Sequence, residues 1–121
     1  MSYFKPLAEL APQDIWDGVV ARTVEGARMS FAVVELASGG VVAAHQHDNE
    51  QIGIVLSGSM SFTIGGETRS LRAGDTYNIP GGVVHHATAG PEGAVVVDVF
   101  APVRSDWSRF EKRPPQPPRW P

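Results

Sequence analysis

Apolar and polar residues alternate along most of the chain, in short runs that are separated by turn-forming residues. The first two runs, 18–24 and 29–36, are divided by the segment 25–28. Six later runs share this pattern, at 41–47, 51–57, 60–65, 68–73, 75–80 and 94–100. A period of two is typical of strands that bury one face, so the pattern predicts β structure nearly throughout.

The breaks between these runs contain glycine where the chain has to change direction. Gly58 with Ser59, and the corner 65–67, permit the positive backbone angles that tight hairpins require, so we expect a hairpin at each. Gly39 and Gly40 predict a further turn. Many short strands without a convincing helix predict an all-β, antiparallel sandwich or barrel, because a sheet of this size has to pack on itself or close.

The length of 121 residues is enough for one domain with a single core. We expect an N-terminal leader at 1–17 and a β-barrel domain at 18–102. The segment 10–18 has room for one helical turn. The tail, 103–121, is rich in proline and arginine and cannot continue a central strand, so we expect it to lie extended over the surface or over a partner subunit.

Composition and charge exclude several classes of function. Apolar residues make up 42% and charged residues 19%, as in an ordinary globular protein. A net charge of -3 supplies no basic field for phosphates, so nucleic acid is not an expected partner. No apolar run approaches the roughly 20 residues that span a bilayer, and the first residues lack the pattern of a signal peptide. The absence of cysteine excludes disulfides and thiolate ligands, and we expect a cytoplasmic protein.

All four histidines lie in two short clusters on segments that contain glycine. His45 and His47 are two residues apart on a predicted strand, so they project from the same face and could bind one metal ion. The turn 80–82 would bring His85 back toward the same space. His86 points the opposite way, and we expect it at an edge or on the surface.

The side chain that would complete such a site is Glu50 or Gln51. On a regular strand Gln51 shares a face with Gly53 and Val55, and Glu50 faces away, but a β-bulge would reverse the two. A histidine pair alone is more often a surface feature than a ligand set. The pair, the nearby polar side chain and the later histidine together favour a metal site.

Asp98 interrupts an otherwise apolar strand, where it shares a face with Phe100. Apolar surroundings would raise its pKa toward values that suit a general acid or base, whereas at a sheet edge it would simply face solvent. Arg104 could pair with Asp98 or hold a substrate carboxylate. Tyr77 is a candidate for core packing or for proton donation.

The spacing of these residues resembles the two sequence motifs of the cupin family. The first motif, a glycine, an HxH pair, a glutamate and a glycine, matches Gly39, His45, His47 and Gly58, with Gln51 where glutamate is usual. The second motif matches Gly74, Pro80, Gly82 and His85, with Ala89 where asparagine is usual.

This resemblance covers residues 29–100 and implies a small jelly-roll β-barrel, commonly dimeric, with a metal at its centre. Together with the strand parity it favours Gln51 over Glu50 as the oxygen ligand. The implied ligands of one divalent ion are His45, His47, Gln51 and His85.

The end of the predicted barrel is also similar to that of pectin-degradation cupins, which open the ring of unsaturated uronates. In those proteins an aspartate, a phenylalanine two residues on and an arginine four further on line the metal cavity, and Asp98, Phe100 and Arg104 match this spacing. Many small cupins end in the same way, and polyketide cyclase cupins are a second similar group. The resemblance therefore leaves the substrate open.

These features predict a metal-dependent isomerase, cyclase or lyase that acts on a small oxygenated anion, with Tyr77, Asp98, Phe100 and Arg104 around the reacting molecule. A neutral glutamine ligand leaves the charge of the ion uncompensated, which favours Lewis-acid chemistry. Zinc, nickel, manganese and iron are all candidates, and iron would permit a dioxygenase instead. A non-enzymatic barrel that binds a small ligand is the third hypothesis. We expect a homodimer.

Overall fold

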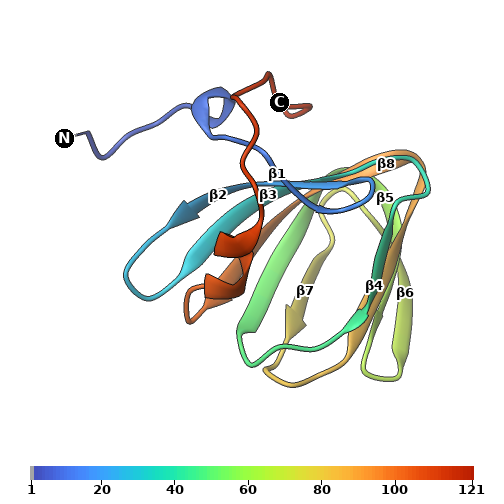
Figure 1. Ribbon diagram of the computed structural model, residues 1–121. Coiled ribbons are helices and arrows are strands. Elements are labelled where there is room, and N and C mark those ends of the chain that lie inside the picture. Colours follow the sequence, from blue (N-terminus) through green and yellow to red (C-terminus); the bar gives the residue numbers. More distant parts are fainter. Residues whose placement is uncertain (1) are drawn as a thin grey trace.

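Strands contain somewhat more than half of the described residues and pair in antiparallel fashion throughout, as the hydrophobic pattern predicts. The computed structural model describes residues 2–121, in which eight strands and two short 3₁₀ helices follow one another (Figure 1). In chain order the elements are η1 (Leu7–Glu9), β1 (Gln13–Trp16), β2 (Val19–Glu25), β3 (Ser30–Leu36), β4 (Val41–His45), β5 (Glu50–Ile64), β6 (Glu67–Arg72), β7 (Thr76–Ile79), β8 (His85–Ala101) and η2 (Ser105–Arg109).

Two sheets share the long strands β5 and β8, which run through both. The first sheet has the order β1-β2-β3-β8-β5-β7 and uses the C-terminal half of β8 with the N-terminal half of β5. The second has the order β4-β8-β5-β6 and uses the other halves. Because the shared strands bend between the two, the sheets fold over one another around an interior, which gives the jelly-roll barrel (Figure 1).

Glycine makes this bend possible. The pairing of β5 with β8 shifts in register close to Gly58, which has a φ of 76°, and Gly93 on β8 has a φ of 73°. A Cβ atom at Gly58 would overlap the backbone of Gly93, so the two strands can approach only without side chains here. The hairpin expected at Gly58 and Ser59 is therefore wrong. The chain continues through a bulge, and the run 51–57 and residues 60–64 belong to one strand, β5.

The other expected turns lie where glycine predicts them. Gly65 has a φ of 61° in the connection between β5 and β6, and Gly39 has a φ of 66° between β3 and β4. Gly82, with a φ of 81°, lies between β7 and β8.

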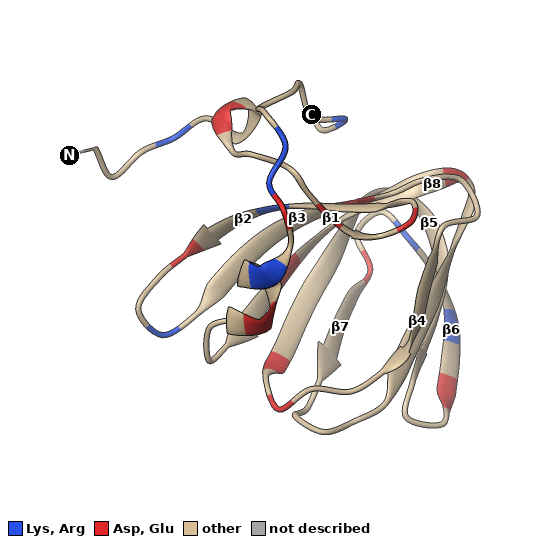
Figure 2. Cartoon of the chain, viewed as in Figure 1, with Lys and Arg blue, Asp and Glu red and all other residues tan. Residues whose placement is uncertain are grey.

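The interior of the barrel is apolar, and charges lie mainly outside it. Buried apolar side chains from both sheets form one core, among them Val19, Val34, Leu36, Val55, Met60, Phe62, Ile79, Ala87, Val96 and Phe100. Basic and acidic positions are interspersed, many of them in turns and at strand ends (Figure 2). Within residues 2–121, no helix has the length and apolar character that crossing a membrane requires.

The predicted leader contributes a strand to the barrel. β1 pairs with β2 in antiparallel fashion, and Ile15 of β1 is buried in the core. The one helical turn lies at Leu7–Glu9, ahead of the segment 10–18 in which we expected it.

The start of the tail packs against the pocket, and its end lies over the outer surface of its own barrel, one of the two places expected. In η2, Trp107 is buried. Farther on, the backbone N–H of Arg119 donates to the carboxylate of Glu35 at 2.7 Å, and Arg22 donates to the same oxygen at 2.9 Å. The tail therefore covers a buried ion pair on the outer face of β2 and β3.

The Gly58→Ala substitution is expected to destabilise the barrel by several kcal/mol, because it adds a steric overlap to the cost of a positive φ. Gly39→Ala is the matched control. It has a similar φ but nothing within 4 Å of an added Cβ, so its cost should stay near ~1 kcal/mol. Chemical denaturation of both variants measures the difference, and equal destabilisation would contradict the role of the Gly58–Gly93 corner.

Candidate metal centre and pocket

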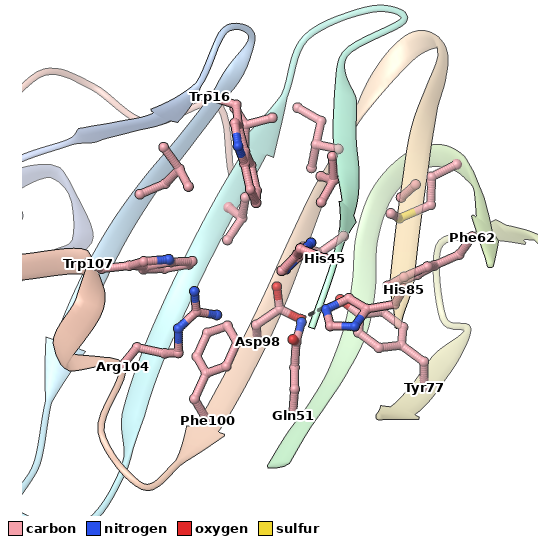
Figure 3. A pocket seen from close by; sticks show the side chains of 18 residues that line it. Trp16, His45, Gln51, Phe62, Tyr77, His85, Asp98, Phe100, Arg104 and Trp107 are labelled. Atoms are coloured by element: carbon pink, nitrogen blue, oxygen red, sulfur yellow. Dashed lines mark hydrogen bonds between the residues drawn. The ribbon is translucent and has the colours of Figure 1, made fainter. Parts of the chain in front are cut away.

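A pocket opens between the two sheets, and most of the predicted site residues line it (Figure 3). Its cavity volume is about 50 Å³, which is room for a few water molecules, and the pocket opens to solvent. The titratable and amide side chains in its wall are His45, Gln51, Tyr77, His85, Asp98 and Arg104. Apolar and aromatic side chains form the rest of the wall, so a few polar groups converge in a largely apolar space.

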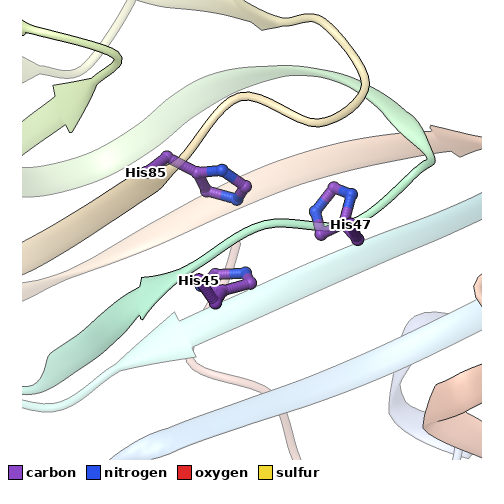
Figure 4. A group of neighbouring side chains, drawn as sticks. All are labelled: His45, His47 and His85. Carbon is purple, nitrogen blue, oxygen red and sulfur yellow. The ribbon is translucent and has the colours of Figure 1, made fainter.

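Three histidines from two distant parts of the sequence, 45–47 and 85, meet beside this pocket (Figure 4). His45 ends β4 and lies directly opposite His85, the first residue of β8, because these two strands pair. His47 follows in the loop, where its carbonyl oxygen accepts a hydrogen bond from Gly82 N–H at 2.8 Å. One ring nitrogen from each histidine lies within 4.8 Å of the other two. His85 therefore lies beside His45 and His47, as the turn at 80–82 predicts.

Each of the three imidazoles is held neutral with one nitrogen free. In His45, His47 and His85, Nδ1 lies 2.8, 3.0 and 2.9 Å from a backbone carbonyl oxygen two residues away. A carbonyl only accepts, so Nδ1–H donates and Nε2 keeps its lone pair. Burial lowers the pKa of all three rings and brings that of His85 to about 4.

The free lone pairs fit a cation. Among residues 2–121, the buried Nε2 of His85 has no hydrogen-bond partner. Nε2 of His47 lies 3.1 Å from Oε1 of Gln51. Both of these atoms are acceptors, so no proton lies between them, and a shared metal ion would satisfy both. We call His45, His47, Gln51 and His85 the four-donor cluster.

Gln51, rather than Glu50, faces the histidines. Gln51 is buried, whereas Glu50 is exposed at the start of β5. The Gln51 amide also approaches Asp98 and lowers the pKa of that carboxyl. Because a carboxylate accepts hydrogen bonds, this contact turns the amide N–H toward Asp98 and the amide oxygen toward His47.

Asp98 is buried in the middle of the first sheet, not at an edge. Its segment of β8 pairs with β3 on one side and with β5 on the other. The hydroxyl of Tyr77 donates to Asp98 Oδ1 at 2.5 Å. Burial raises the pKa of Asp98 to about 6, against the opposing effects of Tyr77, Gln51 and the Arg104 charge. Burial and the neighbouring carboxyl raise the pKa of Tyr77 well above its usual value, so Tyr77 remains a donor.

Arg104 packs against two aromatic rings that also contact each other edge to face. Its guanidinium carbon lies 4.7 Å from the ring centroid of Phe100 and 4.5 Å from that of Trp107. Nε and Nη2 both donate to Asp106 at 2.9 Å, which holds the pKa of Asp106 below its usual range. Arg104 therefore pairs with Asp106 and not with Asp98. Its guanidinium is directed into the pocket (Figure 3).

Two tryptophans in the pocket wall were missed by the sequence reasoning. The ring centroid of Trp16 lies 5.2 Å from that of His45, and the ring centroid of Trp107 lies 4.5 Å from the guanidinium carbon of Arg104. Both belong to the terminal segments, where the four-residue strand β1 and the short η2 give too few periods for a pattern to be recognised. His86 is exposed, as its parity predicts.

The chain is similar in sequence to known proteins over most of its length. The family model described as "Cupin domain" matches residues 32–100. The pectin degradation protein KdgF of Dickeya dadantii (strain 3937) is 31% identical over 97 residues, which cover 78% of this chain and 88% of that protein.

Solved structures have the same fold. The structure of KdgF from Halomonas sp. superposes with a TM-score of 0.80 at 30% identity, over 88% of this chain and 98% of that one. An RmlC-like cupin from Shewanella frigidimarina NCIMB 400 superposes with a TM-score of 0.82 at 24% identity, over 88% and 96% of the two chains.

The His85→Ala variant is expected to lose most of its bound metal, because it removes a buried donor that has no other partner. His86→Ala, the matched control on the next residue, should keep the wild-type metal content. Elemental analysis of the two variants, purified alongside the wild type, measures this. A second matched pair, Gln51→Ala and Glu50→Ala, separates the two oxygen ligands, and metal loss in the Glu50 variant alone would contradict the assignment of Gln51.

Proposed function

The chain belongs to the cupin family, and from its site we propose that it is a metal-dependent enzyme of the isomerase, cyclase or lyase kind. Its substrate in this proposal is a small oxygenated anion such as an unsaturated uronate. The observation that carries the proposal is the position of Asp98, a buried carboxyl with a pKa of about 6, in one pocket with histidine donors and a guanidinium. The similarity to KdgF proteins supports the substrate class.

The four-donor cluster is where a divalent ion would be held. Three neutral imidazoles and an amide oxygen suit zinc, nickel, manganese or iron, and these donors bring no negative charge. When bound, such an ion would supply Lewis-acid polarisation of a carbonyl or hydroxyl oxygen of the substrate.

Asp98 is the group that we assign to proton movement. A carboxyl with a pKa of about 6 is present in both protonation states near neutral pH, which is the condition for an effective general acid or base. The Tyr77 hydroxyl donates a 2.5 Å hydrogen bond to Oδ1 of Asp98. This bond fixes the orientation in which the carboxyl would give or take a proton. Tyr77 thus acts through Asp98 in this proposal.

Arg104 is the group that we assign to substrate binding. Its charge is buried in a largely apolar pocket and is directed inward, where a substrate carboxylate would meet it. Phe100 and Trp107 pack against the guanidinium, and Asp106 accepts hydrogen bonds from Nε and Nη2, so the orientation of Arg104 is set before substrate arrives. Such preorganisation lowers the entropic cost of binding.

A dioxygenase that uses iron is the second candidate, because three imidazoles with open positions also suit oxygen chemistry. A barrel that binds a small ligand without turnover is the third. Metal content together with turnover in the absence of oxygen separates the three. The homodimer stays a prediction, for which the exposed apolar residues Val24, Phe31 and Ile52 on the outer face are a candidate surface. The cytoplasmic location also stays a prediction.

The Asp98→Asn variant is expected to lower kcat on an unsaturated uronate by about 100-fold or more, because the amide cannot exchange a proton with the substrate. Its metal content should stay near that of the wild type, since the imidazoles are unchanged. Glu50→Gln, an exposed acid beside the site, is the control and should keep full activity. Assays are run without oxygen, and wild-type turnover by Asp98→Asn would remove Asp98 from the mechanism.

The Arg104→Gln variant is expected to raise KM for a carboxylate substrate by about 10- to 100-fold, because a charge-assisted hydrogen bond contributes ~1.5–3 kcal/mol. Arg109→Gln, at the end of the short helix that Arg104 precedes but outside the pocket wall, should leave KM unchanged. Steady-state kinetics on one substrate and on its neutral ester measure both effects. An equal KM change for the acid and the ester would argue against a contact between Arg104 and the carboxylate.

A further inference from the structure

Three residues form one row across three neighbouring strands of the first sheet. Gly53 of β5 pairs with Tyr77 of β7 on one side and with Asp98 of β8 on the other. The strands β7 and β8 are not neighbours, and since β5 lies between them their backbones are roughly 10 Å apart. Even so, the Tyr77 hydroxyl donates to Asp98 Oδ1 at 2.5 Å. The contact therefore passes over the backbone of β5 (Figure 3).

The space above Gly53 is already filled by the two residues that it separates. A Cβ atom at this position would come within 2.5 Å of Asp98 Oδ1 and within 2.5 Å of Cζ of Tyr77. Two residues along β5, Gln51 faces the same way and lies between Ile79 of β7 and Phe100 of β8. At that position the middle strand does carry a side chain. The phenol thus occupies the volume that a side chain at position 53 would otherwise take.

Gly53 is not needed here for an unusual backbone angle. Its φ lies outside the positive region in which glycine is preferred, unlike that of Gly58 on the same strand. The requirement at Gly53 is therefore one of space alone.

We propose that Gly53 is a positioning residue of the site: because it lacks a side chain, Tyr77 can reach across β5 and fix the carboxyl of Asp98 inside the pocket. With Tyr77 on Oδ1 and the Gln51 amide close by, Asp98 has one orientation toward the four-donor cluster. A side chain at position 53 would displace the phenol, and Asp98 would lose the hydrogen bond that orients it. The consequence for catalysis rests on the function proposed above, whereas the geometric statement does not.

The geometry is tested by stability and by NMR, without any substrate. Gly53→Ala should lower Tm clearly in the wild-type background and much less in a Tyr77→Ala background, where the ring carbons that the new Cβ meets are gone. The proton resonance of the hydrogen-bonded Tyr77 hydroxyl, identified by its loss in Tyr77→Phe, should also be lost in Gly53→Ala. Gly66→Ala, which adds a Cβ with nothing within 4 Å, is the control and should keep the resonance and the Tm. An unchanged resonance and Tm in Gly53→Ala would overturn the proposal.

The functional consequence is tested on protein whose metal content matches the wild type. Gly53→Ala and Tyr77→Phe should each lower kcat ~10-fold or more with little change in KM, and the double variant should be no worse than either one. Tyr77→Phe removes only the hydroxyl, so it supports or overturns the positioning role even if Gly53→Ala does not fold. Wild-type kcat in Tyr77→Phe would overturn that role. A different result would be loss of the hydroxyl resonance in Gly53→Ala together with full activity of Asp98→Asn. That result would support the positioning of Tyr77 by Gly53 and would reject the proposed function of Asp98.

Discussion

The pairing of β5 with β8 is the interaction on which the rest of the structure depends. The two strands are hydrogen-bonded from Glu50 opposite Ala101 to Ile64 opposite His85, and the other strands attach to this pair directly or through β3. The bend at Gly58 lets one strand pair serve two sheets and so encloses a pocket. Gln51 and Gly53 come from one of these strands, and His85, Asp98 and Phe100 come from the other. The same hydrogen bonds that build the fold therefore set the geometry of the site.

The polar groups of the pocket compensate one another in an apolar surrounding. The imidazoles remain neutral because burial disfavours their charged form, and each satisfies Nδ1 on a backbone carbonyl. Asp98 is the carboxyl in the pocket wall, and Tyr77 with Gln51 satisfies it by hydrogen bonding. A metal held by these neutral donors would keep its full positive charge.

The terminal segments complete a pocket that the barrel alone would leave open. β1 brings Trp16 against His45, and η2 brings Arg104 and Trp107 against Phe100. The tail that follows is anchored on the buried pair of Arg22 and Glu35. Substrate recognition, as proposed above, thus relies on segments that do not belong to the two cupin motifs.

Much of the site could be predicted from the sequence, because the direction of a side chain on a strand depends only on its position along that strand. Side chains alternate in direction along a strand, so parity predicts that His86 points outward, and parity together with the cupin spacing predicts that Gln51 points inward. His47 lies beyond the end of β4, and there the cupin spacing is the better guide. Glycine was harder to interpret, since a positive φ suits a hairpin and a bulge equally well, and at Gly58 only the approach of Gly93 decides between them.

What only the tertiary structure decided is which distant residues become neighbours. The choice of Asp106 as the partner of Arg104, the two tryptophans of the wall and the contact of Tyr77 with Asp98 all depend on how strands and terminal segments pack. The sequence by itself determined antiparallel β structure, because this follows from alternation along each strand. Together with the spacing of the cupin motifs it also indicated the barrel, the histidine cluster and the inward Gln51. Strand register determined that Tyr77 meets Asp98 over Gly53, because pairing between strands is a non-local property that alternation does not encode.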